Sequence, residues 1–384
     1  MLQFFNPSHL SAGFVAVLVG YTSSAVIVFQ AASAAGAGPA EISSWLWALG
    51  VGMAVTSIGL SLYYRAPVLT AWSTPGAALL VTALAGVPIA EATGAFLFSS
   101  LLITLCGIFG WFDTIMRRVP RALAGAMLAG VLLRFGMELF TSMQTQPALV
   151  AAMLLSYLGI RRFIPRYAIA LTLLVGLLLT GLQGSIHFEA VSLQFARPIF
   201  TAPSFSATSL IGIGLPLFIV TMASQNIPGI AVLRANGYAT PASPVIAATG
   251  ITGLVLAPFG GFAFNLAAIT AAICMSPDAD PRPERRYLAA VWAGLFYLVT
   301  GILGATVAAL FAAFPHELVA TVAGLALIGT IATSLAGALA AEHERDAALI
   351  TFLTTASGVS LFGIGSAFWG LVIGLVAAWI NRKA

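Results

Sequence analysis

Long apolar segments follow one another along almost the whole chain of 384 residues, and this succession restricts the possible folds more than any other feature. A helix needs about 20 predominantly apolar residues to cross a bilayer. Only 7% of the residues are charged and 60% are hydrophobic, whereas a soluble domain carries roughly 25% charged residues. Lipid must therefore be the solvent for most of the surface, and an ordinary soluble protein is excluded.

Glycine, proline and charged residues divide this apolar sequence into candidate membrane segments. They are 11–36, 43–63, 75–86, 92–111, 120–138, 144–160, 167–181, 207–232, 243–257, 264–275, 284–311, 316–338, 346–358 and 364–381. The polar interval of about 183–206 separates seven segments from seven and is too short for a soluble domain. We expect an all-α polytopic membrane protein of about 14 transmembrane segments, whose first segment is retained rather than cleaved as a signal peptide.

The basic residues predict the orientation of these segments. An even number of spans places both termini on one side, and fourteen of the sixteen Lys and Arg residues then fall on that side, with Arg134 and Arg197 as exceptions. The positive-inside rule makes this side cytoplasmic. The net charge of +4 is spread over loops, which favours membrane orientation over nucleic-acid binding.

The sequence lacks the patterns of a catalytic or metal site. Cys106 and Cys274 lie far apart in apolar segments, where a small buried side chain is the simplest interpretation. Ala347 stands four residues after His343, so the zinc motif HExxH is absent. All twelve acidic residues fall at expected loops or helix ends. We therefore expect no enzyme activity, no metal and no cofactor.

Two of the segments, 75–86 and 264–275, are too short to cross the membrane. Each follows an extended stretch with a proline, and these prolines, Pro67 and Pro258, lie 191 residues apart, about half the chain length. Seven spans per half give the second half the opposite polarity. Paired interrupted segments of this kind are typical of inverted-repeat transporters. We expect an anion between the N-termini of the two half-helices; the alternative is that both are ordinary kinked packing segments.

The residues at the starts of these half-helices are candidates for ligand contact. Thr74 is a possible N-cap with Pro75 as the first helical residue, and Asn265 could cap the second half-helix. Four aromatic residues flank the two starts and could form walls for an aromatic ligand: Trp72, Phe259, Phe262 and Phe264.

The first segment of each half carries unusual polar residues. Gln225 and Asn226 are adjacent amides in an apolar span, where they are costly unless they face a partner or a cavity. We favour ligand contact for this pair over hydrogen bonding between helices. For Tyr21, Ser23 and Ser24 in the first segment, ligand contact and close helix packing stay equally open.

Four stretches carry a family resemblance: GYTSS at 20–24, TAWSTPG at 70–76, QNIPG at 225–229 and PFGGFAFN at 258–265. They resemble the benzoate/proton symporter family of bacterial inner-membrane transporters, and the similarity runs through nearly the whole chain. The resemblance implies seven-plus-seven inverted repeats, as in nucleobase and in bicarbonate- or sulfate-type transporters. It also implies a core (transport) domain of residues 1–119 and 207–311, containing spans 1–4 and 8–11. The remaining residues, 120–206 and 312–384, would form a gate (scaffold) domain of spans 5–7 and 12–14.

The same resemblance implies a secondary active transporter that imports benzoate or a related aromatic carboxylate with a proton. Elevator-like movement of core against gate is expected, commonly in a homodimer joined through the gate domains. In the nucleobase branch, glutamates of spans 8 and 10 bind substrate and take part in proton coupling. Gln225 and Asn265 stand in the matching stretches here, so a nucleobase is disfavoured and the coupling proton has no obvious residue.

These considerations predict ten substrate-binding residues: Tyr21, Ser24, Trp72, Ser73, Thr74, Gln225, Asn226, Gly261, Phe264 and Asn265. The alternative function is a passive channel, or a uniporter or exchanger, for another small organic or inorganic anion.

Overall fold

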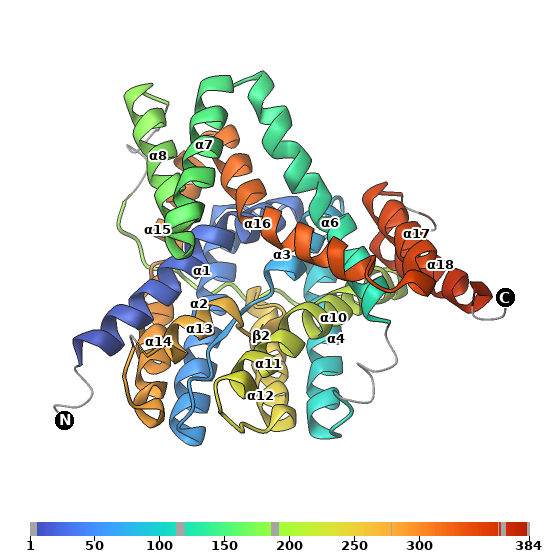
Figure 1. Ribbon diagram of the computed structural model, residues 1–384, viewed down its shortest axis with the longest axis horizontal. Coiled ribbons are helices and arrows are strands. Elements are labelled where there is room, and N and C mark those ends of the chain that lie inside the picture. The colour runs from blue at the N-terminus through green and yellow to red at the C-terminus, as the bar shows by residue number, and fades with distance from the viewer. Residues whose placement is uncertain are drawn as a thin grey trace.

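A computed structural model describes residues 6–112, 120–185, 192–277, 279–359, 361 and 366–381. Within these ranges the protein is mostly helical (Figure 1). The helices of the first half are α1 (Pro7–Ala34), α2 (Pro39–Tyr64), α3 (Thr74–Ala83), α4 (Ile89–Ile108), α6 (Arg121–Thr141), α7 (Pro147–Phe163) and α8 (Ala168–Leu182). The helices of the second half are α9 (Ala207–Ser209), α10 (Leu215–Thr221), α11 (Ile227–Ala235), α12 (Ala242–Leu256), α13 (Ile269–Met275), α14 (Tyr287–Ile302), α15 (Gly304–Ala313), α16 (His316–Ala338), α17 (Arg345–Ala356) and α18 (Ser366–Asn381).

Every apolar segment expected from the sequence contains a helix, although two segments differ in detail. By length and apolar composition, six helices of the described residues can cross a membrane, or eight if each of two bent pairs counts as one span. The segment expected at 284–311 is bent by 69° between α14 and α15. Gly304 lies at this bend against α2, where an added Cβ would come within 2.9 Å of the Ser43 carbonyl oxygen. A glycine at this position therefore allows the start of α15 to pack closely on α2.

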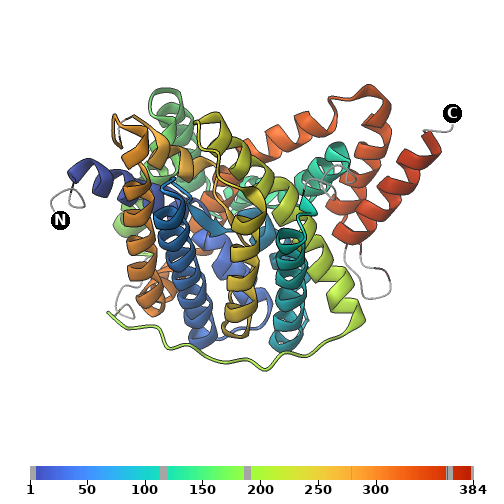
Figure 2. The same cartoon turned by 90° about the horizontal axis from the view of Figure 1, so that it is seen from below.

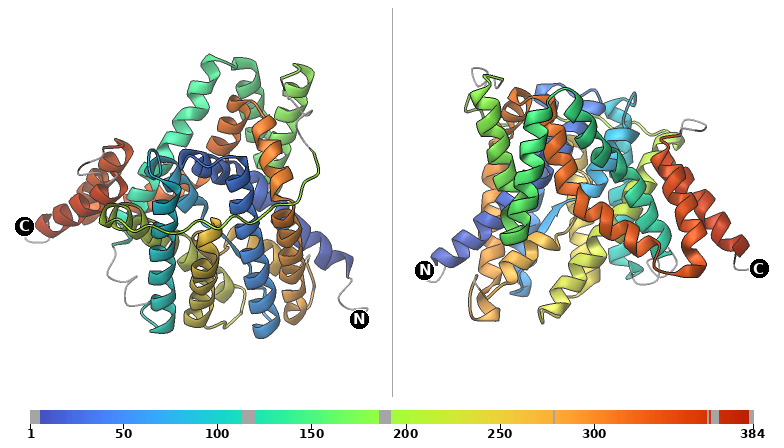
Figure 3. Two further views of the ribbon diagram at one scale, coloured as in Figure 1. Left: turned by 180° about the vertical axis from the view of Figure 1, so that it is seen from behind. Right: turned by 45° about the horizontal axis from the view of Figure 1, so that its top comes forward.

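The helices form two groups that meet near the middle of the molecule. α2 packs against α14 and α4 against α12, and these four helices stand side by side (Figure 1). α7 and α8 pack against each other and against α16 (Figure 3). A separate hydrophobic cluster holds this second group together: Leu139, Leu149, Val150, Met153, Tyr157, Ala168, Leu318, Val322 and Leu325.

Small residues allow the membrane helices to approach closely. A Cβ on Gly50 of α2 would lie 2.4 Å from the Cα of Gly301 in α14. In lipid, the hydrophobic effect does not drive helices together as it does in water. Close van der Waals contacts of this kind stabilise the association of membrane helices instead.

An extended segment, residues 192–206, connects the two halves and runs past the ends of several helices (Figure 2). Its backbone N–H groups donate to carbonyls of distant elements: Ala196 to Ile302 at 2.8 Å, Thr201 to Pro258 at 2.7 Å and Ser204 to Ala90 at 2.9 Å. Residues 192–206 are thus fastened to the ends of distant helices.

Two short strands, β1 (Thr70–Trp72) and β2 (Phe264–Leu266), pair antiparallel within the protein interior, with Ala71 opposite Asn265. Hydrogen bonds from Ser73 N–H to the Ala263 carbonyl at 3.1 Å and from Ala267 N–H to that of Leu69 at 2.9 Å continue the pairing. Extended backbone is tolerated at such depth only when its polar groups are satisfied within the protein. Extended backbone is therefore confirmed at β1 and β2 within the two expected stretches, and the antiparallel pairing places the starts of α3 and α13 at opposite ends of the strand pair.

Strand β2 also shows that the helix expected at 264–275 begins later than the sequence predicts. The segment 264–275 begins as β2 and becomes helical only at Ile269, because its first residues bond to β1.

Candidate functional site

A cavity of about 650 Å³ lies between the two groups of helices. From one side it is lined by residues of α1, β1, α3, α13, α14 and the helix that contains Gln225, and from the other by residues of α8 and α16. Its polar wall groups include Thr22, Ser24, Thr74, Gln225, Thr270 and Thr330. No charged side chain lines this cavity among the residues that the structure describes. The chemistry of the site therefore rests on hydroxyls, an amide, helix ends and rings.

The start of α3 reaches the cavity at Thr74 and Pro75. Ser73 is the N-cap of this helix, since its hydroxyl oxygen accepts a hydrogen bond of 3.0 Å from the Gly76 N–H. The expected cap, Thr74, is the first helical residue instead. Because Ser73 takes the capping role, the Thr74 side chain is left to line the cavity.

The start of α13 lines the opposite part of the cavity with Ala268, Ile269 and Thr270. The expectation that Asn265 caps this helix is wrong, since Ala268 occupies the N-cap position and makes no side-chain bond there. Asn265 is fully buried in β2, and its amide donates to the Ala263 carbonyl at 3.0 Å. The strand pairing holds Asn265 several residues before the helix begins.

The adjacent amides Gln225 and Asn226 have different surroundings. Both belong to a π-helical turn, Met222–Asn226, between α10 and α11. Gln225 lines the cavity. Asn226 is fully buried, accepts a hydrogen bond of 3.0 Å from the Leu266 N–H and donates to the Met222 sulfur at 3.1 Å. Asn226 thus fastens this turn to β2, while Gln225 is available to a ligand.

An aromatic cluster forms one part of the cavity wall. The Trp72 indole N–H donates to the Ser24 hydroxyl at 2.9 Å. The Tyr21 ring packs edge-on against Trp72, with centroids 4.8 Å apart, and lies 6.2 Å from the ring of Tyr297. Trp72 and Tyr297 line the cavity. Sequence reasoning missed Tyr297, because a tyrosine within an apolar span carries no local signal of its position.

The phenylalanines beside the strands face elsewhere. Phe262 packs against Trp45 and Phe96 at 5.8 and 5.3 Å between centroids, and Phe259 packs against Trp47 at 5.9 Å. Phe264 is buried at 1% exposure. These rings contribute to the core behind β2 rather than to the cavity wall.

The ten predicted site residues therefore separate into three sets. Four of them line the cavity: Ser24, Trp72, Thr74 and Gln225. Three support it from behind through a cap, a ring contact or a buried hydrogen bond: Ser73, Tyr21 and Asn226. The remaining three lie in or next to β2, away from the lining: Gly261, Phe264 and Asn265.

Comparison with known proteins assigns the chain to a family. Residues 3–380 match the family model BenE, described as benzoate membrane transport protein. The chain belongs to this family. It is 51% identical over 368 residues to the inner membrane protein YdcO of Escherichia coli (strain K12), with 96% of this chain and 94% of that protein covered. It is 43% identical over 372 residues to the benzoate membrane transport protein of Acinetobacter baylyi (strain ATCC 33305 / BD413 / ADP1), with 97% and 94% covered.

Solved structures share the fold at low sequence identity. The transmembrane domain of the cyanobacterial bicarbonate transporter BicA superposes with a TM-score of 0.58 at 14% identity, covering 98% of this chain and 97% of that one. Murine SLC26A9, an anion transporter solved in the inward-facing state, gives a TM-score of 0.59 at 12% identity, with 98% and 68% covered. This member of the benzoate transport family is therefore a membrane transporter and not an enzyme.

The far wall of the cavity was not predicted. It consists of Pro165, Ile169 and Ala170 around the start of α8, and of Ala326, Leu327 and Thr330 in α16. These residues lie in ordinary apolar spans, and only the packing of distant helices brings them to the site.

Proposed function

We propose that this transporter imports benzoate or a related aromatic carboxylate together with a proton. The observation that carries the proposal is the uncharged cavity at the starts of α3 and α13, which combines Trp72 and Tyr297 with hydroxyl and amide groups. A fixed carboxylate in such a cavity would repel an anion, and none lines it in the described residues. The name of the Acinetobacter relative, a benzoate membrane transport protein, supports the same substrate class.

In the proposed binding mode, the carboxylate lies between the N-termini of α3 and α13. Helix N-termini favour anions because their first N–H groups lack intrahelical partners. In this mode the Thr74 hydroxyl and the Gln225 amide, which both line the cavity, donate hydrogen bonds to the carboxylate. The ring then packs against Trp72 and Tyr297, since aromatic pairs gain from edge-to-face and offset contacts.

We also propose an elevator-like movement between two domains. Residues 1–119 and 207–311 would form the core, and residues 120–206 and 312–384 the gate. Both proposed domains contribute residues to the cavity wall. Trp72, for example, belongs to the core and Thr330 to the gate. A substrate at this boundary is released when the core slides along the gate. The shared fold with anion transporters supports this mechanism.

The proposed membrane arrangement has fourteen spans in two inverted repeats, with both termini in the cytoplasm of a bacterial inner membrane. The positive-inside distribution of Lys and Arg supports the orientation. We also propose that two copies form a homodimer joined through their gate domains.

Uptake of labelled benzoate into proteoliposomes tests the function. With an acidic exterior, we expect saturable accumulation above the external concentration and its loss when a protonophore removes the gradient. Protein-free liposomes at the same pH measure the diffusion of neutral benzoic acid and are subtracted. Uptake that neither saturates nor exceeds equilibrium would instead identify a passive channel, and the absence of any carboxylate uptake would reject a carrier of this class.

A further inference from the structure

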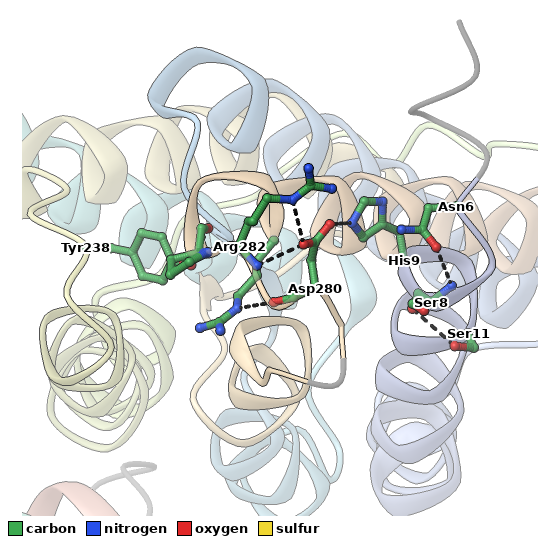
Figure 4. A network of polar contacts seen from close by, with 9 residues as sticks. Asn6, Ser8, His9, Ser11, Tyr238, Asp280 and Arg282 are labelled. Carbon is green, nitrogen blue, oxygen red and sulfur yellow. Dashed lines mark hydrogen bonds and ion pairs between the residues drawn. The ribbon is translucent and has the colours of Figure 1, made fainter.

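A buried histidine and a buried aspartate meet outside the cavity lining, between α1 and the loop after α13. His9 lies in α1, and its Nε2 is 2.9 Å from Oδ2 of Asp280 in the loop after α13 (Figure 4). Both side chains are only 1% exposed. A buried ionisable pair is costly in free energy and is often retained for function, so this contact between residues 271 positions apart needs an explanation.

Asp280 is held in place independently of His9. Its Oδ1 accepts from the Arg282 backbone N–H at 2.9 Å and from Arg282 Nε at 3.4 Å, and its backbone carbonyl accepts from Arg286 Nε at 2.8 Å. Burial raises the pKa of Asp280, but the hydrogen bonds from Arg282 and His9 outweigh burial and hold the pKa below its ordinary value. Asp280 is therefore a fixed negative charge facing the imidazole.

The other charged and titratable groups near the pair belong to neighbouring loops. Arg282, Glu284, Arg285 and Arg286 follow Asp280 directly, and the Tyr238 hydroxyl donates to the Pro283 carbonyl at 2.8 Å (Figure 4). Asp278 lies outside the described residues. Of these groups, only Asp280 has a recorded hydrogen bond or ion pair with His9 in the described structure.

The second ring nitrogen of His9 has no hydrogen-bond partner among the described residues. Its Nδ1 is buried and makes no hydrogen bond with any residue that the structure describes. A neutral imidazole that donates Nε2–H to Asp280 leaves Nδ1 as a vacant acceptor. A proton bound at Nδ1 would give the ring two donors, and the second donor would lack an acceptor among the described residues.

The pair links two elements that form the cavity. α1 lines the cavity with Thr22 and Ser24, and α13 with its following turn lines it with Thr270 and Ser276. His9 precedes Thr22 and Ser24 on α1, and Asp280 follows Thr270 and Ser276 in the chain. The His9–Asp280 contact thus joins the first part of α1 to the loop after α13, the two elements that carry these lining residues.

We propose that His9 is the proton-binding residue of coupled transport, taking up the proton at Nδ1 while Nε2–H stays bonded to Asp280. This inference rests on the proposed proton symport. Because the Asp280 carboxylate is a fixed negative charge 2.9 Å from the ring, the protonated ring is favoured while this contact holds, whereas a conformation that separates the two side chains favours the neutral ring. Because the proton binds the two conformations differently, it shifts the equilibrium between them, and the shift reaches the substrate site through α1 and α13.

Two transport assays on purified His9→Gln in proteoliposomes test this assignment. The glutamine amide can still donate to Asp280 but cannot take up a proton at neutral pH. We expect accumulation of labelled benzoate driven by an acidic exterior to fall at least tenfold, to the level measured without a gradient. Exchange of internal unlabelled for external labelled benzoate at equal pH should stay within about twofold of wild type. His316→Gln, which changes an exposed histidine 3.4 Å from Glu138, is the matched control and should retain both activities.

Two results would overturn the assignment. Gradient-driven accumulation by His9→Gln at the wild-type level would show that the proton binds elsewhere. Equal loss of accumulation and exchange, in this variant and in His9→Asn, would show that the contact is only structural. Failure of the wild type to respond to the gradient would instead reject proton coupling itself, so the two failures are distinguishable.

Discussion

The indole N–H of Trp72 donates a 2.9 Å hydrogen bond to the hydroxyl of Ser24, which joins β1 to α1 at the wall of the cavity. The same hydroxyl donates to the Gly20 carbonyl at 2.8 Å. Ser24 therefore sets the orientation of the Trp72 ring, against which we expect the substrate ring to pack. The bond also explains why a small polar residue stands at this point of an apolar helix.

Ser24→Ala should weaken substrate binding. Removing one buried hydrogen-bond partner costs about 1 kcal/mol, so we expect KM for benzoate to rise about fivefold while the protein still purifies as a folded species. Saturation curves of uptake in proteoliposomes measure this change. Ser11→Ala is the control, since the Ser11 hydroxyl is exposed and donates to the Ser8 carbonyl on its own helix. An unchanged KM in Ser24→Ala would contradict the proposed role of Trp72.

Replacing Asn226 should lower the stability of the protein, whereas replacing Gln225 should abolish benzoate binding. Asn226→Ala leaves the buried Leu266 N–H without its acceptor, and an unsatisfied buried donor costs about 1–3 kcal/mol. We therefore expect a clear fall in melting temperature in detergent. Gln225→Ala should leave the melting temperature within about 2 °C of wild type but abolish its rise on addition of benzoate, because ligand binding stabilises the folded state. The reverse pattern would exchange the roles of the two residues.

A bulky residue at Thr330 should block transport. Thr330 of α16 lines the cavity, so Thr330→Phe places a ring between the two proposed domains. We expect uptake to fall at least tenfold. Thr333→Phe adds the same ring three residues later, at an exposed position, and should keep most of the activity. Similar uptake in the two variants would remove α16 from the transport path.

The Asp280 carboxylate should make stability depend on pH in acid. Its pKa is lower in the folded state than the ordinary value, which is about 3.9 for aspartate. Its stabilising contribution is then fully present above that ordinary value and is lost as the pH falls through the lower, folded-state pKa. Asp280→Asn should lack this component, so its melting temperature should fall less than that of wild type between pH 5 and pH 3. Parallel curves for the two proteins would exclude the effect.

Much of the helix pattern could be predicted from the sequence, because the need to remain in lipid acts on each segment separately. The two interrupted segments were also recognisable, since Pro67, Pro258 and the shortness of the apolar runs are local features. Cap positions were less accurate. Ser73 caps α3 where Thr74 was expected, and the expected cap Asn265 lies in a strand. Strand pairing between distant segments, which no local pattern encodes, set both of these positions.

The sequence by itself therefore determined the membrane class, the approximate positions of the helices, the family resemblance and four residues of the cavity wall, Ser24, Trp72, Thr74 and Gln225. Only the tertiary structure showed that Asn226 faces β2, that Tyr297 and Thr330 reach the cavity, and that His9 meets Asp280. The physical reason is that hydropathy and capping depend on neighbouring residues. A cavity or a buried ion pair depends instead on how helices far apart in the chain pack, and every apolar helix offers several faces for that packing.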